Sequence, residues 1–572
     1  MAGHLTSPEK LSPGKTILAG IRIDPAGART LMTPKLALLT LIATTASLRL
    51  LAAWNLGLGN DEAYHFLYAM HPAPSYFDHP PMVAAVETVG LAIVGDPFSP
   101  LGLRLGFIAL FAGSTWLMAR IARRWYGEWP GFFAALALNL SGYYGLAVGS
   151  FALPDGPLLF FWLLTLDRID LALEEPARLR PWAAVGLAWG LAMLSKYHAV
   201  FLPVGTVLYL LLRPGRRRLL KSPGPYLAIG LGLLIFSPVI AWNARNGWAS
   251  FAFQGGRAVG GLSLRPDALL AAIGSQAAYL FPWIWIPLMV VGWRLIAGWR
   301  DRDDEHERLA LCLCVAPLAT FTAVACLRPV LPHWGLVGVL PLFPALGRAL
   351  AGRAQADPRL TRRRIAFATA FSAALLAATV AEYRWGWLQR GPAGGLGLLT
   401  AKTDPTADLY GWDQVAARLD RLGLLDDPRT FVFTKNWYQS AQVAHAIGMR
   451  RPVVCYNLED ARGFAFWSAP ADWLGRDGVF VMINDDYTPF SFYERWFRSC
   501  EALDDFEVTR RGEPVRRVRI FRLNEQRIAL PFQYTKEQAD ERLRLRERLQ
   551  GQAVTYSPPP EVGSKRHSVR RD

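Results

Sequence analysis

The chain has 572 residues, of which 52% are hydrophobic and only 19% are charged, against roughly 25% charged in soluble proteins. This composition excludes a disordered chain and an ordinary soluble enzyme. The net charge of +16 would suggest nucleic acid in a soluble protein, but much of the excess lies in short loops between apolar segments. We therefore expect a membrane protein with no nucleic-acid partner.

The N-terminal two thirds of the chain alternate between apolar segments and short polar loops. Residues 1–32 are polar and basic, and we expect them to form a cytoplasmic tail. Residues 33–381 predict a polytopic α-helical protein of about eleven spans, because a span needs about 20 mostly apolar residues. The predicted spans are 33–53, 101–120, 130–149, 155–171, 182–195, 198–212, 226–243, 268–293, 309–327, 333–349 and 365–381. The short apolar segment 82–95 predicts an interfacial helix.

The distribution of Lys and Arg predicts the orientation of these spans. If the N-terminus is cytoplasmic, the inside loops begin near residues 120, 168, 213, 294 and 348, and they are rich in basic residues. The loops on the other side are much poorer in them, which is the pattern of the positive-inside rule. An odd number of spans then places the C-terminal part in the periplasm of a bacterial inner membrane.

After residue 381 the composition becomes that of a soluble domain. Strands are predicted at 430–434, 452–456, 478–483 and 515–523, and a helix at 438–447. This alternation predicts a small α/β domain on the outer face within residues 382–530, followed by a charged helix and a disordered tail at 531–572. Cys455 and Cys500 lie in this domain, and the sequence leaves open whether they pair.

Charged and imidazole side chains gather in the loops that are predicted to face outward. The first outer loop, 54–99, carries Asp61-Glu62 and Asp78-His79. Later outward turns carry Asp155, Lys196 and His333. Such groups are costly next to a membrane core, so they are often functional. Together they predict one site at the outer membrane surface.

The two paired motifs also have structural interpretations. Asp61-Glu62 can cap a helix N-terminus, where the helix dipole favours negative charge. Asp78-His79 can mark a turn in which Pro80-Pro81 fixes the start of the next helix. We favour the functional interpretation of both motifs because each accompanies the other in one loop.

For the single polar residues, the functional and the structural interpretations are more evenly matched. Asp155 can serve as a helix N-cap, Lys196 can extend its ammonium group to the interface, and His333 can be an interfacial histidine. We keep both interpretations for these three residues. For His65 and His198 we favour a structural role.

The stretch Asp61-Glu62-Ala63-Tyr64-His65, followed by Tyr76-Phe77-Asp78-His79-Pro80-Pro81, resembles the first outer loop of family 39 glycosyltransferases in the membrane-embedded C superfamily. The resemblance covers about residues 33–350 and is greatest to bacterial lipopolysaccharide galacturonosyltransferases. Lipid A aminoarabinose transferases and protein O-mannosyltransferases share parts of the pattern. Further matching motifs are Pro154-Asp155-Gly156-Pro157, Ser195-Lys196-Tyr197, Trp242-Asn243, Gly247-Trp248 and His333-Trp334.

The resemblance implies a glycosyltransferase that uses a polyprenyl-phosphate-linked sugar as donor. The acceptor is expected to be a lipid or an envelope glycan at the outer face of the inner membrane, and the anomeric centre is inverted in one displacement. By this resemblance Asp61 is the candidate general base, Glu62 is its partner, and Asp78 holds the acceptor or a metal.

The leaving phosphate requires positive charge nearby. His79 stands where the aminoarabinose transferases have Lys, so Lys196 is expected to supply the missing charge, assisted by the loop at 244–267. The expected substrate-binding residues are His79, Asp155, Lys196, Arg245, Arg257 and His333. No cofactor is certain; a divalent metal is left open, with Asp78, His79 and His333 as candidate ligands.

Two alternative functions are kept. A lipid-linked-sugar flippase or transporter would explain the spans, but not the acids clustered ahead of an interfacial helix. A protein O-mannosyltransferase would perform the same chemistry on Ser or Thr, and we expect such an enzyme to carry a β-trefoil-type insert, whereas the C-terminal pattern here is α/β.

Overall fold

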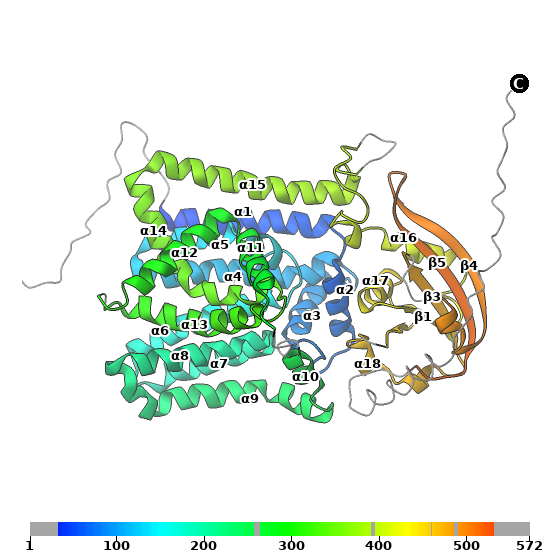
Figure 1. Ribbon diagram of the computed structural model, residues 1–572, viewed down its shortest axis with the longest axis horizontal. Coiled ribbons are helices and arrows are strands. Elements are labelled where there is room, and N and C mark those ends of the chain that lie inside the picture. Colours follow the sequence, from blue (N-terminus) through cyan, green and yellow to red (C-terminus); the bar gives the residue numbers. More distant parts are fainter. Residues whose placement is uncertain are drawn as a thin grey trace, which may run out of the picture.

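The computed structural model describes residues 33–256, 263–301, 303–389, 395–458, 460–484 and 490–530. In these ranges the chain forms a bundle of long helices and a smaller part built around a five-stranded sheet (Figure 1). The sheet lies at one end of the bundle, and short helices lie between the two. The basic tail expected at 1–32 and the segment expected at 531–572 lie outside the described residues.

The bundle contains the helices that correspond to the predicted spans. They are α1 (Pro34–Asn55), α4 (Pro100–Tyr126), α5 (Glu128–Asn139), α6 (Asp155–Glu174), α7 (Leu179–Ser195), α8 (Phe201–Leu212), α9 (Pro223–Arg245), α11 (Pro266–Leu280), α12 (Pro282–Ala297), α13 (Glu305–Ala325), α14 (Phe343–Ala356) and α15 (Pro358–Trp385). Between the bundle and the sheet lie α2 (Asn60–Met70), α3 (Met82–Val94) and α10 (Ala249–Gly256). Proline opens several bundle helices, where its missing N–H would have no partner within the helix.

Among the described residues, six helical segments are long and apolar enough to cross a membrane, or eight if each of two bent pairs counts as one span. The predicted number of about eleven is therefore not confirmed. The predicted spans at 155–171, 182–195 and 198–212 do form helices, but α6 carries several charged residues and α7 and α8 are short.

Two predicted spans are broken. The segment 268–293, predicted as one span, bends by 115° between α11 and α12. The break is at Phe281, because the residue before a proline is disfavoured in the helical region, and Phe281 adopts a positive φ of 64°. The segment 130–149 bends by 67° between α5 and a π-helix, η1 (Gly142–Val148).

The smaller part contains a mixed sheet with strand order β2-β1-β3-β5-β4. Strands β1, β2 and β3 are parallel, whereas β5 pairs antiparallel with both β3 and β4. The strands are β1 (Thr430–Thr434), β2 (Val453–Cys455), β3 (Asp477–Ile483), β4 (Phe497–Arg510) and β5 (Glu513–Gln526). The accompanying helices are α16 (Trp412–Arg421), α17 (Trp437–Ala446), α18 (Phe464–Trp467) and α19 (Phe490–Glu494). The strands and the helix that the sequence predicts in this part are all present, and β4 is a further strand that the sequence does not predict.

Strand β4 is absent from the sequence prediction because it is an edge strand with a largely polar, exposed surface. It forms a hairpin with β5 across Arg511 and Gly512, whose φ values of 53° and 88° both lie in the left-handed region. Such a turn matches the twist of paired strands, and a glycine at the second position favours it.

Cys455 and Cys500 are both free thiols. They lie on β2 and β4, the two edge strands of the sheet, four strand spacings apart. At about 4.8 Å per spacing this is roughly 19 Å, beyond the reach of a disulfide. The sequence left this pairing open, and the structure does not form it.

One hydrophobic cluster joins the two parts. Buried side chains of α2, such as Tyr64 and Phe66, belong to the same cluster as Phe433 and Phe480 of the sheet. Polar contacts reinforce this packing, since Gln442 of α17 donates to the Leu58 carbonyl at 2.8 Å. The sheet part is therefore positioned rigidly over the end of the bundle.

Candidate active site

A cavity of about 640 Å³ opens at the end of the bundle nearest the sheet. Its wall is formed by α2, the loop that follows α2, and the turns that begin α6, α8 and the segment before α14. The C-terminal half of α15 and one loop of the sheet part complete the wall. The sequence-predicted residues that line this cavity are Asp61, Asp78, His79, Asp155, Lys196 and His333.

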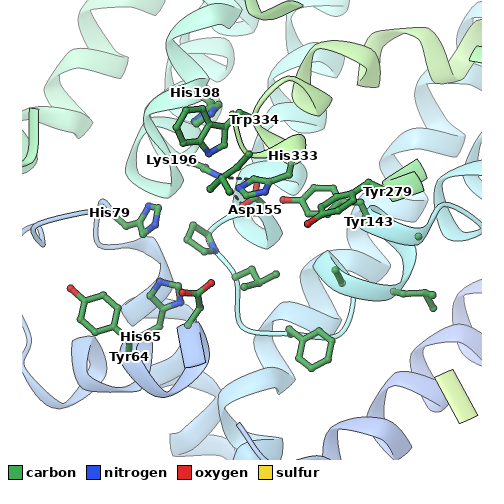
Figure 2. A pocket seen from close by; sticks show the side chains of 18 of the residues that line it. Tyr64, His65, His79, Tyr143, Asp155, Lys196, His198, Tyr279, His333 and Trp334 are labelled. Carbon is green, nitrogen blue, oxygen red and sulfur yellow. Dashed lines mark hydrogen bonds and ion pairs between the residues drawn. The ribbon is translucent and has the colours of Figure 1, made fainter. Parts of the chain in front are cut away.

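Lys196 and Asp155 form an ion pair on one side of the cavity (Figure 2). The Lys196 Nζ donates to both Asp155 carboxylate oxygens, at 2.9 and 2.7 Å. Asp155 begins α6, and Lys196 follows the last residue of α7, so two helix ends bring the pair together. His333 lies beside this pair and stacks on Tyr143 with ring centroids 5.5 Å apart.

Asp78 forms a second ion pair, with Arg462 of the sheet part. The Arg462 Nη1 donates to an Asp78 oxygen at 2.9 Å, and the Tyr64 hydroxyl donates at 3.0 Å. Tyr68 donates to the same carboxylate. Burial raises the pKa of Asp78, but the charge of Arg462 and these hydrogen bonds outweigh it and lower the pKa to about 2. Asp78 is thus an ionised anchor between the two parts.

His79, which follows Asp78 in the sequence, lines the cavity (Figure 2). Burial lowers the pKa of its imidazole to about 3, so the ring is neutral at physiological pH. Its Nδ1 is buried and has no hydrogen-bond partner within the described ranges. His65 is different, because its Nδ1 lies 3.1 Å from the carbonyl of Ala152. That contact agrees with the structural role favoured for His65.

Asp61 is the predicted acid whose carboxylate has no hydrogen-bond or ion-pair partner in the part of the chain that the structure describes. It lies on the exposed side of the first turn of α2. Asp61 lines the main cavity and also a second cavity of about 480 Å³ between the bundle and the sheet part. The second cavity is further lined by Asp408, Trp437 and Tyr438 of the sheet part. Asp61 therefore stands where the two cavities meet.

Glu62, the predicted partner of Asp61, does not line the main cavity. Arg104 binds both of its carboxylate oxygens, at 2.8 and 2.6 Å. The backbone N–H groups of Gly59 and Ala152 donate to the same oxygens at 2.9 Å each. Burial raises the pKa of Glu62, but Arg104 and these hydrogen bonds outweigh it and leave the pKa lowered. In this position Glu62 caps α2 and forms a buried ion pair with Arg104, and its role as catalytic partner of Asp61 stays a prediction.

Of the two arginines predicted in the 244–267 loop, the structure describes Arg245. Arg245 is exposed at the C-terminal end of α9 and is not part of the cavity wall. The expectation that it contacts substrate is not supported by this position. Arg257 lies outside the described residues.

The candidate metal ligands are not gathered into a ligand set. Within the described ranges, no group of three or more His, Cys, Asp or Glu side chains is arranged to hold a metal ion. Asp78 is engaged with Arg462, Tyr64 and Tyr68, and His333 lies beside the Lys196–Asp155 pair.

Arg462 is the main site residue that sequence reasoning missed. It lies 384 residues after its partner Asp78, and its guanidinium also stacks on Trp437, 4.0 Å from the ring centroid. No local pattern around Arg462 marks it, because its importance depends on how the sheet part docks onto the bundle.

Residues 78–242 match the family described as dolichyl-phosphate-mannose-protein mannosyltransferase. An undecaprenyl phosphate-alpha-4-amino-4-deoxy-L-arabinose arabinosyl transferase of Pseudomonas paraeruginosa is 30% identical over 303 residues, 49% of this chain and 51% of the relative. Lipid A galacturonosyltransferase RgtD of Rhizobium johnstonii is 23% identical over 289 residues, 48% of this chain and 57% of the relative. The match thus spans about half the length of these relatives. The resemblance to family 39 glycosyltransferases is confirmed.

Solved structures extend the likeness beyond the N-terminal half. The structure of ArnT from Cupriavidus metallidurans in the apo state superposes with a TM-score of 0.56 at 17% identity, over 86% of this chain and 98% of ArnT. The structure of the same protein bound to undecaprenyl phosphate gives a TM-score of 0.56 at 18% identity, over 84% of this chain and 97% of ArnT. The chain is a multi-pass membrane protein with the fold of ArnT.

Proposed function

We propose that this chain is a glycosyltransferase of the bacterial inner membrane. It transfers a sugar from a polyprenyl-phosphate donor to a lipid or envelope-glycan acceptor at the outer face. The observation that carries the proposal is the unpaired carboxylate of Asp61 at the junction of the two cavities. The names of the relatives, which describe transfer from undecaprenyl phosphate sugars and transfer to lipid A, support the same reaction class.

The geometry supports a direct displacement. The main cavity holds the donor, and the acceptor hydroxyl approaches through the second cavity. Asp61 takes the hydroxyl proton as the acceptor oxygen bonds to the anomeric carbon from the face opposite the phosphate. The bond from that carbon to the phosphate oxygen breaks, and polyprenyl phosphate leaves with the bonding electrons. The anomeric configuration is inverted.

The leaving phosphate gains charge in this step, and the cavity wall carries two cationic groups. Lys196 and Arg462 hold positive charge in the wall, balanced by Asp155 and Asp78. The donor phosphate can accept hydrogen bonds from these cations, which stabilises the charge that develops in the transition state. Leu375 and Leu376 of α15 form an apolar side of the cavity, which suits a polyprenyl chain that enters from the bilayer.

The order of the helices, and of the turns that line the cavity, supports a specific number of membrane crossings. The turns that contribute to the cavity follow α1, precede α6, follow α7, join α11 to α12 and precede α14, which are alternate connections of the bundle. We infer eleven crossings, with α11 as a re-entrant helix and α6, α7 and α8 as crossings of marginal length or polarity. A cytoplasmic N-terminus then places the cavity and the sheet part in the periplasm, in agreement with the positive-inside pattern.

The experiment uses the purified full chain in lipid vesicles with labelled polyprenyl-phosphate sugars and an extract of envelope lipids. We expect label to move to a new lipid or glycan with wild-type protein and not with Asp61→Asn. If both proteins only redistribute intact donor between leaflets, the protein is a flippase and the proposal is wrong. A protein acceptor is added in a parallel reaction. If label appears on its Ser or Thr side chains, the O-mannosyltransferase alternative holds.

A further inference from the structure

A second apolar cavity, of about 650 Å³, lies between α5, α12, α14 and α15 and is separate from the site described above. Its walls include Phe133, Leu136, Trp283, Ile286, Leu350 and Phe367. We call it the α12–α15 groove. A neighbouring apolar cavity of about 480 Å³ shares Phe133, Leu136, Thr361 and Ile365 with it, so the apolar surface continues around α5. Long hydrocarbon chains fit such a surface.

One end of the α12–α15 groove is cationic. Arg353, Arg363 and Arg364 line it, and all three are exposed. Within the described ranges, no carboxylate forms an ion pair with any of the three guanidinium groups. Several other arginines on this side of the bundle are neutralised, as Arg124 is by Asp167 and Asp170. Three guanidinium groups beside an apolar groove match a phosphate group that carries acyl chains.

Part of the groove wall is aromatic. Trp283 and Phe367 line the groove, and their ring centroids are 5.6 Å apart. Trp283 also contacts Phe281, with centroids 4.7 Å apart, and Phe281 belongs to the wall of the catalytic cavity. An aromatic partition therefore separates the groove from the catalytic cavity.

The groove and the catalytic cavity contact different stretches of α15. Arg364 lines the groove and Leu375 lines the catalytic cavity, eleven residues further along the helix. At 1.5 Å per residue this is roughly 17 Å along the axis. The arginines are thus too far away to bind a donor phosphate whose sugar lies at Asp61. A polyprenyl chain that ran down the groove would place its apolar end against three charges.

We propose that the α12–α15 groove binds an anionic phospholipid from the leaflet opposite the catalytic cavity. The phosphate contacts Arg353, Arg363 and Arg364, and the acyl chains lie between α12 and α15 along Ile286 and Phe367. The bound lipid supports α15, whose C-terminal half forms part of the catalytic cavity through Leu375, Leu376 and Thr379. The site does not depend on the proposed sugar transfer.

Native mass spectrometry of the purified full chain tests the site. The protein is titrated with phosphatidylglycerol, which is anionic, and with phosphatidylcholine, which is zwitterionic. We expect wild type to retain phosphatidylglycerol at least 10-fold better. The triple variant Arg353→Gln, Arg363→Gln, Arg364→Gln is expected to lose that preference. The control triple variant Arg180→Gln, Arg218→Gln, Arg359→Gln removes three exposed arginines that do not line the groove, and it is expected to keep the preference.

A second variant keeps the measurement decisive if the groove triple variant does not fold. Ile365→Trp fills the apolar part of the groove and leaves every charge in place, and we expect it to lower retention of both lipids at this site. The proposal is overturned if the groove variants keep the preference, or if the control loses it equally. It is also overturned if polyprenyl phosphate displaces phosphatidylglycerol, since the groove would then hold the donor chain.

Discussion

At the scale of single residues, the site separates acids that hold the structure from the acid available for chemistry. Glu62, Asp78 and Asp155 each face a cation at hydrogen-bonding distance. Asp61 remains open to both cavities. A carboxylate that already accepts several hydrogen bonds is a weaker base, so the structure favours Asp61 for proton removal.

Glu62 is predicted to matter for stability. Glu62→Ala leaves the buried Arg104 without its carboxylate, and breaking a buried ion pair in this way costs about 3–5 kcal/mol. Thermal unfolding of the purified protein measures the loss. The control is Glu128→Ala, whose partner Arg123 and own side chain are 53% and 59% exposed, and for which we expect less than about 1 kcal/mol. Equal melting temperatures for Glu62→Ala and Glu128→Ala would contradict the structural role.

The pH dependence of stability follows from His79 and Asp78. Burial lowers the pKa of His79 to about 3, from 6.5 in the unfolded chain, so the unfolded chain binds a proton that the folded protein does not. Stability therefore falls as the pH drops below about 6.5. The contribution of Asp78, whose pKa is lowered from 3.8 to about 2, is lost only as the pH drops below about 4.

Melting temperatures measured at pH 7 and at pH 5 separate the contributions of His79 and Asp78 to stability. We expect the decrease seen in wild type to be smaller in His79→Gln, because glutamine does not titrate. Asp78→Asn is expected to lower stability at both pH values without changing the decrease between them. An unchanged decrease in His79→Gln would show that His79 is not buried in its neutral form.

At the scale of elements, the β4–β5 hairpin is attached to the end of α15 by buried charges. Arg510 at the end of β4 is fully buried and binds Glu382 of α15 at 3.2 Å, and it also contacts Asp404. This contact links the sheet part to the helix that borders the catalytic cavity. The sequence shows these residues only as isolated charges, because they lie more than a hundred residues apart.

Loss of Arg510 is predicted to loosen the hairpin from the bundle. Arg510→Ala leaves Glu382 and Asp404 buried without their cation, so we expect a loss of about 3–5 kcal/mol and faster proteolysis of the sheet part. Arg517→Ala on the partner strand is the matched control. Its ion pair with Asp505 is about half exposed on both sides, and we expect at most about 1 kcal/mol there. Equal protease sensitivity of the two variants would contradict this account.

The sequence predicted helices and strands correctly where the local pattern of residues decides the structure. The long apolar segments, the helix after Pro80-Pro81 and the buried strands all follow from periodicity and proline placement. The sequence did not predict the bend before Pro282 or β4. At the bend, an apolar run continues across the break, so composition does not reveal it. At β4, exposure removes the hydrophobic alternation.

At the scale of the whole molecule, the site is an assembly of distant segments. The sequence identified Asp61, Asp78, His79, Asp155, Lys196 and His333, which all line one cavity. The sequence treated Asp61 and Glu62 as one pair and did not separate their roles. Because neighbouring residues on a helix point to different sides, the two carboxylates have different surroundings in the structure. The sequence also missed Arg462 and the second cavity, since both exist only when the sheet part docks onto the bundle.

The proposed orientation can be measured in whole cells. In a variant without the native cysteines, single cysteines at Glu507 on β4 and at Arg218 are exposed positions at opposite ends of the molecule. We expect a membrane-impermeant thiol reagent, admitted to the periplasm, to label the cysteine at 507 and not the cysteine at 218. The reverse pattern would invert the topology, and labelling of both would contradict the five crossings inferred between the two positions.

The central claim is that Asp61 removes the proton from the acceptor. Single-turnover transfer and polyprenyl phosphate binding are measured on Asp61→Asn, with Asp408→Asn in the second cavity as the matched control. We expect Asp61→Asn to lose about 10²–10⁴-fold in the transfer rate, the usual contribution of a general base, with binding of polyprenyl phosphate unchanged. The control is expected to keep the single-turnover rate at saturating acceptor. Transfer by Asp61→Asn at the wild-type rate would contradict the account, as would a loss explained entirely by weaker donor binding.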